Sequence, residues 1–392
     1  MIKLNFNFDQ TFLNDYFDYC YQTFISDEIT KARGLINDAN LKNAFDLIFN
    51  KDDIRYLVEC PAEDLEKAIH TCFELLPILA ERFFYTYLLR KIKVPQNCIQ
   101  LPVKSCNFEM AVKNTIDELV KLNTNYSNLV LTPSYIKDLK CKEISLSKKK
   151  RILCRLENIT RGNSSLTNKN IEKFPDWINS IECIFSYSKM VDRYGYLLSE
   201  NADTNICAYC GLEDIQLYNT DKIQVRADLD HFYPKSKFPF LAISIFNLIP
   251  SGTICNQKHK RNAPMLGFMH PCIDSLQDEV LFKFSIGDKT KIKDTLRIDV
   301  VQNNNFKDKN ISLFKIKYLY DGHNGLRHWF HVIHKLREFH RANGDDLSAI
   351  DFRSIQWESV ITLDEPITKV SAQKFKVDAI NDLFEAKLKV TT

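Results

Sequence analysis

The stretch that decides the fold runs from residue 228 to residue 256 and reads DLDHFYPKSKFPFLAISIFNLIPSGTICN. It opens with alternating polar and apolar residues, which predicts a strand over DLDHF that runs into a loop. A dense apolar stretch follows, and TICNQKHKR (253–261) then has the composition of a short basic helix. The order predicts a compact unit that holds Asp230 and His231 at the end of a strand.

These residue types suit metal-assisted cleavage of a phosphodiester. Such a reaction needs a base that takes a proton from water, and histidine is matched to that task near neutral pH, so we assign it to His231. A hard divalent ion, Mg²⁺ or Mn²⁺, would stabilise the charge that develops on the phosphate. Asp230 and Asn256 supply suitable oxygen ligands. Neighbouring residues on a strand face opposite ways, so Asp230 can hold the metal while His231 faces the water.

In order and spacing, these residues resemble an HNH endonuclease, the ββα-metal fold. In that family a strand carries an Asp-His or His-His pair, a loop carries an Asn, and a short helix carries the last metal ligand. The segments DLDHFYPKS, FNLIPSG and CNQKHK match these three parts, and the nine-residue step from Asn247 to Asn256 is similar to that in the HNH module of CRISPR effector nucleases. The resemblance covers roughly residues 200–275. It implies hydrolysis of DNA, double-stranded more than single-stranded, with Asn247 bracing the loop that holds His231 by backbone hydrogen bonds.

Basic residues surround this segment and are expected to contact nucleic-acid phosphates. By the resemblance, the positions are Lys235, Lys258, His259 and Lys260. A second basic run, KDLKCKEISLSKKKR (137–151), is interpreted as a solvated helix face.

The cysteines suggest a structural metal near the same segment. Cys207 and Cys210 are the only close pair among twelve cysteines, and Cys255 precedes Asn256. Related HNH domains often hold zinc on two CxxC pairs, but the fourth cysteine would fall at residue 252, which is a glycine. Two readings stay open. Either three thiolates bind zinc with an outside fourth ligand, for which Cys272 and His259 are local candidates, or zinc is lost and a packed core replaces it.

A looser similarity places the chain near HNH nucleases of bacterial antiphage islands, including the HNH subunit of Septu-type systems. It rests on FPFLAISIFNLIPSG (238–252), on HP at 270–271 and on LYDGH at 319–323. It implies a defence role and a partner such as an ATPase. The alternative function is a non-catalytic zinc-type module that binds nucleic acid or a partner protein.

The flanking regions predict an α+β protein with three parts. Residues 1–199 are mainly helical and would recognise a target or dock a partner. Pro77 is expected to start, end or kink one helix, and residues 174–200 are expected to form another. Residues 200–275 form the HNH module. Residues 276–392 add a β-hairpin around GDKTK (287–291) and further helices that pack on the module.

Composition agrees with a protein of the cytoplasm that does not enter a membrane. The net charge of +3 excludes a strongly basic protein that coats DNA. The sequence shows neither a secretory signal nor an apolar run long enough to span a bilayer, and we expect its cysteines to stay reduced.

Overall fold

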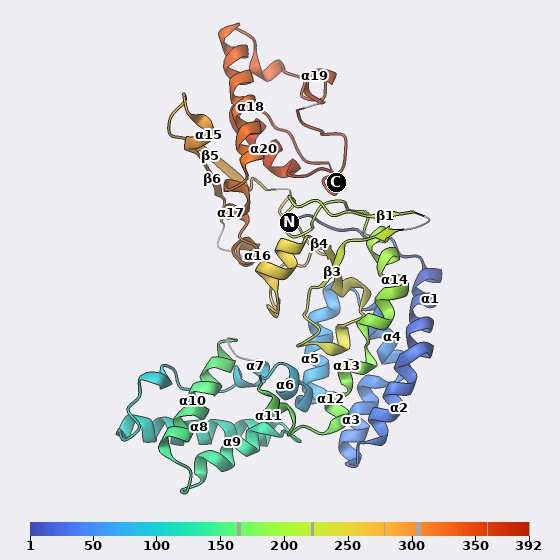
Figure 1. Cartoon of the computed structure of the whole chain (residues 1–392), viewed down its shortest axis with the longest axis vertical. Coiled ribbons are helices and arrows are strands. Elements are labelled where there is room, and N and C mark those ends of the chain that lie inside the picture. The colour runs from blue at the N-terminus through green and yellow to red at the C-terminus, as the bar shows by residue number, and fades with distance from the viewer. Residues whose placement is uncertain (163–165, 221–222, 278, 303–306, 359, 392) are drawn as a thin grey trace. The chain divides into compact units, whose positions relative to one another are not determined.

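A computed structural model of the chain describes residues 1–162, 166–220, 223–277, 279–302, 307–358 and 360–391. The protein is α+β, as predicted, and helices dominate its N-terminal part (Figure 1). The described residues form three small antiparallel sheets of two strands each. None of the helices in the described part of the chain is long and apolar enough to cross a membrane.

The chain divides into two compact units, each built from separate stretches. One, here called the helical unit, consists of residues 14–189 and 235–244. The other, the mixed unit, consists of residues 1–13, 190–234 and 245–392. This division differs from the expected boundaries at 199 and 275. The N-terminal segment belongs with the strands because Ile2 N–H donates to Ala208 O at 2.9 Å and Leu4 N–H donates to Pro271 O at 2.9 Å.

The described residues of the helical unit form helices and short helical turns without a strand. The elements that lie in it or extend into it are α1 (Gln10–Cys20), η1 (Tyr21–Ile25), α2 (Ser26–Gly34), α3 (Ala39–Phe49), α4 (Lys51–Glu59), η2 (Ala62–Asp64), α5 (Leu65–Leu75), α6 (Pro77–Phe83), α7 (Thr86–Leu89), η3 (Cys98–Gln100), α8 (Cys106–Asn125), α9 (Leu131–Lys140), α10 (Leu146–Thr160), α11 (Asn168–Ile171), α12 (Asp176–Asn179), α13 (Ile181–Ile184), α14 (Tyr187–Asn201) and η4 (Pro239–Leu241).

Two sequence predictions about these helices had different outcomes. Pro77 does bound a helix, because it is the first residue of α6, where its missing N–H is not needed. The single helix expected over residues 174–200 is wrong. Three helices occupy the region, and the chain leaves helical geometry at Phe185, whose φ and ψ are −104° and 57°.

A buried carboxylate fixes the start of α9. Glu81 is fully buried, and its oxygens accept hydrogen bonds from the N–H groups of Val130, Leu131 and Thr132 at 2.5 to 3.0 Å, and from the Thr132 hydroxyl at 2.6 Å. Because the first N–H groups of a helix have no partner within it, an acceptor at this end satisfies them. Nearby, α8 and α10 pack through Phe108 and Leu153.

The mixed unit carries all the strands that the structure describes. Its elements after α14 are β1 (Tyr218–Asn219), β2 (Gln224–Val225), β3 (Asp228–His231), η5 (Ile245–Asn247), β4 (Leu248–Ser251), η6 (Ile254–Lys260), β5 (Phe282–Ile286), α15 (Ile292–Thr295), β6 (Leu296–Val300), α16 (Lys307–Leu313), α17 (Ile316–Asp321), α18 (Asn324–Ala342), η7 (Leu347–Ala349), α19 (Ile355–Glu358) and α20 (Gln373–Phe384). The predicted hairpin around residues 287–291 is confirmed as β5 and β6, whose register pairs Phe284 with Ile298.

The C-terminal helices of this unit pack on the turn that contains the CxxC pair. The hydroxyl of Tyr320, on α17, donates to Cys210 O at 2.9 Å. Ala372 N–H donates to Gly211 O at 2.8 Å. The ring of Tyr320 also contacts Phe282, on β5, and Phe375, on α20, and the figure shows the β5–β6 hairpin beside these helices (Figure 1). A shared aromatic core therefore joins the hairpin, the helices and the cysteine turn.

Candidate functional site

The hairpin of β3 and β4 places the predicted site residues within the mixed unit. The strands are antiparallel, and Asp230 lies opposite Ile249 while His231 lies opposite Leu248. The π-helix η6 begins three residues after β4 ends. Two strands followed by a short helix is the order that the sequence predicted. Because neighbouring residues on a strand face opposite sides, Asp230 and His231 project in different directions.

Asn247 fastens the chain that leaves β3. It is fully buried, its Oδ1 accepts a hydrogen bond from Tyr233 N–H at 2.7 Å, and its Nδ2 donates to Tyr233 O at 3.1 Å. Its own carbonyl accepts a hydrogen bond from Phe232 N–H at 2.8 Å. These are the backbone hydrogen bonds expected of Asn247, and they fix the two residues that follow His231.

Asp230 lies in a buried polar pocket. Its Oδ2 accepts a hydrogen bond from the Tyr209 hydroxyl at 2.6 Å, and Lys260 Nζ lies 3.1 Å from each carboxylate oxygen. Burial raises the pKa of Asp230, while the Lys260 ammonium and the Tyr209 hydroxyl act against that rise. Burial likewise lowers the pKa of Lys260, and Asp230 opposes that change. The two groups therefore stabilise each other's charge in a site that neither would occupy alone.

Lys260 is not placed to contact a phosphate, which corrects the sequence assignment. Its side chain is completely buried, and besides Asp230 its Nζ donates to His231 O at 2.6 Å. The reason is the winding of η6, in which Arg261 N–H bonds to Asn256 O five residues earlier. Sequence periodicity assumes the tighter winding of an α-helix and does not foresee this inward direction.

The remaining predicted residues are less constrained. Asn256 is four residues before Lys260, the residue of η6 that contacts Asp230. Within the described part of the chain, the Asn256 amide makes no hydrogen bond. Lys258 is exposed, as a phosphate contact requires, whereas His259 is only partly exposed and its Nε2 is buried without a hydrogen-bond partner among the described residues. Lys235 belongs to the helical unit, where its Nζ lies 4.7 Å from the centre of the Tyr187 ring.

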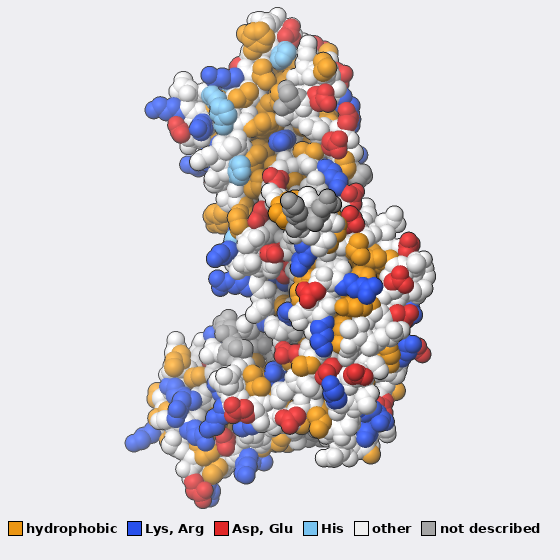
Figure 2. Space-filling view, turned by 45° about the vertical axis from the view of Figure 1, so that its right-hand side comes forward, with side chains coloured by type: hydrophobic (Ala, Val, Ile, Leu, Met, Phe, Trp, Pro, Cys, Tyr) orange, Lys and Arg blue, Asp and Glu red, His pale blue; other side chains and the backbone are white. Residues whose placement is uncertain are grey.

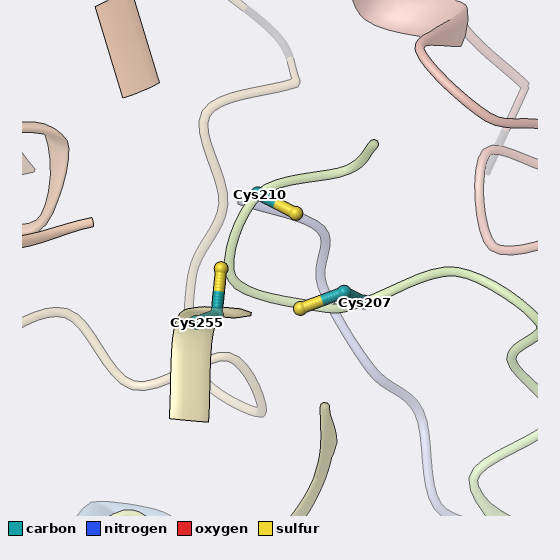
Figure 3. Close-up of side chains that lie close together, drawn as sticks. All are labelled: Cys207, Cys210 and Cys255. Atoms are coloured by element: carbon teal, nitrogen blue, oxygen red, sulfur yellow. The ribbon is translucent and has the colours of Figure 1, made fainter. Parts of the chain in front are cut away.

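Three cysteines converge beside this hairpin. The Sγ atoms of Cys207, Cys210 and Cys255 all lie within 4.8 Å of one another, and all three residues are buried (Figure 3). A tight turn holds the first two, because Gly211 N–H donates to Cys207 O at 2.9 Å. Hydrogen bonds from Cys207 and Cys255 lower the pKa of Cys210, whereas burial raises that of Cys207. Neither Cys272 nor His259, the fourth ligands considered from the sequence, belongs to this cluster.

The donor set fits a structural metal ion. Thiolates bound to one zinc at about 2.3 Å lie about 3.8 Å apart in a tetrahedron, which the 4.8 Å limit on this cluster accommodates. A buried group of three thiols without a disulfide is the chemistry that zinc favours.

Asp230 and Asn256 also fit a hard divalent ion, with one restriction. An ionised carboxylate offers about four acceptor positions, and Tyr209 and Lys260 take about three of them at Asp230. Room for one metal contact remains, and the free amide of Asn256 offers a second oxygen on η6.

Sequence reasoning missed two contributors to this region, Tyr209 and Glu213, and gave Lys260 a different role. Tyr209 stands between the two cysteines of the CxxC turn, Glu213 follows that turn, and Lys260 points inward from η6. A tyrosine or a glutamate in a turn carries no spacing signal of its own.

Comparison of the chain with models of known protein families, with curated proteins and with solved structures gives no match.

Proposed function

We propose that the mixed unit is a metal-dependent HNH-type endonuclease that hydrolyses DNA phosphodiester bonds. The observation that carries the proposal is the β3–β4–η6 arrangement. It puts Asp230 and His231 at the end of one strand and holds the following residues through Asn247. It also begins the short helix η6, which carries Asn256 and contacts Asp230 through Lys260.

The roles follow from the chemistry of each group. His231 takes the proton from the attacking water, because imidazole is a general base near neutral pH. Asp230 and Asn256 hold Mg²⁺ or Mn²⁺, which when bound stabilises the charge on the scissile phosphate. Asn247 keeps His231 in position, and the exposed Lys258 attracts the DNA backbone. The three-cysteine cluster holds a structural zinc that ties η6 to the CxxC turn.

One observation favours the alternative, a non-catalytic module that binds nucleic acid or a partner. The Lys260 ammonium already neutralises Asp230, so a divalent ion would have to bind beside a positive charge. In that case the Asp230–Lys260 ion pair would have only a structural role.

Plasmid cleavage with Mg²⁺ or Mn²⁺ separates the two functions. We expect His231→Ala to slow cleavage at least about 100-fold, because general-base catalysis contributes 10²–10⁴ to a rate. His328→Ala is the matched control, since His328 is an exposed histidine on α18 of the same unit. Circular dichroism would show that both variants keep the fold.

A nuclease of a defence system can depend on a partner, so the assay is repeated with proteins co-purified from the native host, including any ATPase. Wild-type protein that binds DNA but cleaves none under all these conditions would contradict the nuclease assignment and support the binding module.

A further inference from the structure

Glu213 occupies the place of the cysteine that the zinc motif lacks. Gly252 stands three residues before Cys255, where the second CxxC pair would have its first thiol. A Cβ atom added at Gly252 would lie 2.0 Å from Oε2 and 2.1 Å from Cδ of Glu213. Unbonded heavy atoms do not approach a Cβ this closely, so the Glu213 carboxylate fills the space of a side chain at residue 252.

The backbone of Glu213 is bound to the cysteine turn. Its N–H donates to Cys210 Sγ at 3.4 Å, and its carbonyl accepts a hydrogen bond from Cys207 N–H at 2.9 Å. The start of its side chain is therefore fixed beside two of the three thiols. The carboxylate lies at the start of η6, where it interacts with the N–H groups of Thr253, Ile254 and Cys255. Its contacts with Ile254 N–H measure 3.3 and 3.4 Å, which is long for a charged acceptor.

We propose that Glu213 is the fourth ligand of a divalent metal held by Cys207, Cys210 and Cys255. Structural zinc is four-coordinate, and a carboxylate oxygen at 2.0–2.2 Å is an accepted ligand. A carboxylate also keeps the total ligand charge of a four-thiolate site. The Glu213 carboxylate lies outside the group of ligand atoms within 4.8 Å of one another, so it reaches the metal by rotation of its own side-chain bonds and release of the N–H groups at the start of η6. The proposal rests on the structural zinc described above and not on cleavage of DNA.

A swap of ligands tests this assignment. The full-length protein is prepared as wild type, Glu213→Ala, Gly252→Cys and the double variant Glu213→Ala/Gly252→Cys. Zinc affinity is measured by competition with a chromophoric chelator, and the cobalt-substituted proteins are compared by absorption spectroscopy. Asp214→Ala is the matched control, because Asp214 is the neighbouring carboxylate and is exposed.

We expect Glu213→Ala to weaken zinc binding at least about tenfold and to change the cobalt spectrum, because water must replace a protein ligand. Restoring a thiol in the double variant should recover the affinity, with added intensity in the thiolate-to-cobalt band. The Gly252→Cys single variant should bind zinc less tightly than the double variant, because the new cysteine side chain clashes with the Glu213 carboxylate.

Two results would overturn the assignment: a Glu213→Ala protein with wild-type zinc affinity and cobalt spectrum, or wild-type protein that binds no zinc. Neither result depends on DNA cleavage, so a failure here is distinguishable from a failure of the nuclease proposal.

A separate observation concerns a basic cleft in the helical unit. The cleft has a volume of about 850 Å³ and lies between η3, α9, α10 and the segment around α11. Its lining includes six cationic side chains: Lys148, Lys150, Arg151, Arg155, Lys169 and Lys173. Asp138 is the one carboxylate in this lining, and it lies 3.7 Å from Lys148 Nζ. Figure 2 shows Lys and Arg side chains gathered over this end of the unit.

The cations of α10 form a row. Lys148, Arg151 and Arg155 recur at intervals of three and four residues, so they share one face of the helix, while Leu153 and Leu156 are buried on another. Seven residues of helix span about 10 Å, which is the length of duplex axis over which one strand carries about three phosphates. Ile99, which is 72% exposed, adds an apolar contact at the rim.

We infer that this cleft binds the phosphate backbone of duplex DNA. The row of cations extends over several phosphates, and only one carboxylate opposes it. The interpretation of residues 137–151 as a solvated helix face is therefore incomplete, because Lys148 and Arg151 line a concave surface. The inference deepens the proposed function by naming where its substrate is held.

Binding of a labelled 30-base-pair duplex to the full-length protein, without Mg²⁺, tests the inference by fluorescence anisotropy at several salt concentrations. The variant is Lys148→Ala/Arg151→Ala/Lys169→Ala. The control replaces three exposed lysines of the same unit away from this lining, Lys51, Lys67 and Lys113. We expect the affinity of the cleft variant for the duplex to fall at least about tenfold. The slope of log K against log[salt] should become shallower by about 2.7, because three cations are removed and each neutralised phosphate contributes about 0.9.

Equal losses in the two triple variants, or displacement of the duplex by micromolar ATP, would overturn the inference, the second result indicating a nucleotide site. Because no cleavage is measured, an inactive catalytic site leaves this test unaffected.

Discussion

At the scale of single residues, the two asparagines have opposite roles. Asn247 is fully buried and uses both side-chain atoms on the backbone of Tyr233. Asn256 is partly exposed and has no hydrogen bond from its amide within the described chain. An amide that leaves its hydrogen-bonding capacity unused on a helix face is available to a ligand.

We therefore expect Asn247→Ala to lower the free energy of unfolding by about 2–4 kcal/mol, because it leaves two buried backbone groups without partners. Asn256→Ala should change it by less than about 0.5 kcal/mol, as is usual for substitutions away from buried networks. Urea unfolding of both variants measures the difference. Similar losses of stability in the two proteins would contradict these roles.

How far the sequence predicts the site depends on the residue. Strand alternation predicted the strand that carries Asp230 and His231, whereas the bracing role of Asn247 was implied by the resemblance to HNH endonucleases. Lys260 was assigned to phosphate and Glu213 was not singled out, since their directions depend on the π-winding of η6 and on the empty space at Gly252. Those features arise from tertiary packing and leave no periodic signal.

At the scale of elements, a buried histidine packs against the chain that leaves β3. The ring of His270 lies 4.3 Å from that of Phe232, measured between centroids, and its Nδ1 accepts a hydrogen bond from Cys272 N–H at 3.1 Å. Burial lowers the pKa of His270 to about 3. The histidine is therefore neutral in the folded protein well above pH 3.

This pKa has a consequence for stability. In the unfolded chain His270 becomes protonated below about pH 6.5, whereas in the folded protein it becomes protonated only near pH 3. Stability is thus complete above pH 6.5 and falls as the pH drops toward 3, by about 2 kcal/mol at pH 5.

The check is urea unfolding of wild type and His270→Phe at pH 7.5 and pH 5. Acid release of a structural metal affects both proteins alike, so the difference between them isolates the histidine. We expect the variant to lose less stability on acidification than wild type. A difference that does not vary with pH would show that His270 titrates normally.

The elements themselves were predicted unevenly. The β5–β6 hairpin follows from its alternation around the turn at residues 287–291, and α6 starts at Pro77 for a local steric reason. The region 174–200 has a helical apolar pattern throughout, yet the chain breaks at Phe185. Ile184 and Phe185 are both buried, so we attribute the end of the helix to their tertiary packing. The local sequence pattern carries no information about that packing.

At the scale of the whole molecule, each unit is assembled from distant stretches of chain. Residues 235–244 follow the candidate site in sequence yet belong to the helical unit, where Tyr16 OH donates to Ile243 O at 2.8 Å. Backbone hydrogen bonds such as that from Ile2 to Ala208 add the N-terminal segment to the mixed unit. These long-range pairings explain why boundaries drawn along the sequence at 199 and 275 differ from the observed units.

This organisation gives the proposed nuclease two candidate contacts with DNA. One is the exposed Lys258 on η6, and the other is the basic cleft of the helical unit. The cleft prediction belongs to this scale, because its duplex affinity is expected to persist when His231 is replaced. Loss of binding upon His231→Ala would show instead that the catalytic region alone holds the DNA.

The central claim is that His231 is the base of a metal-dependent nuclease. The most direct measurement is the single-turnover rate of cleavage of a labelled duplex by zinc-loaded wild type and His231→Ala, at equal Mg²⁺ and with matched melting temperatures. The account predicts a rate at least about 100-fold lower for the variant, with duplex affinity unchanged. Equal rates for the two proteins would contradict it.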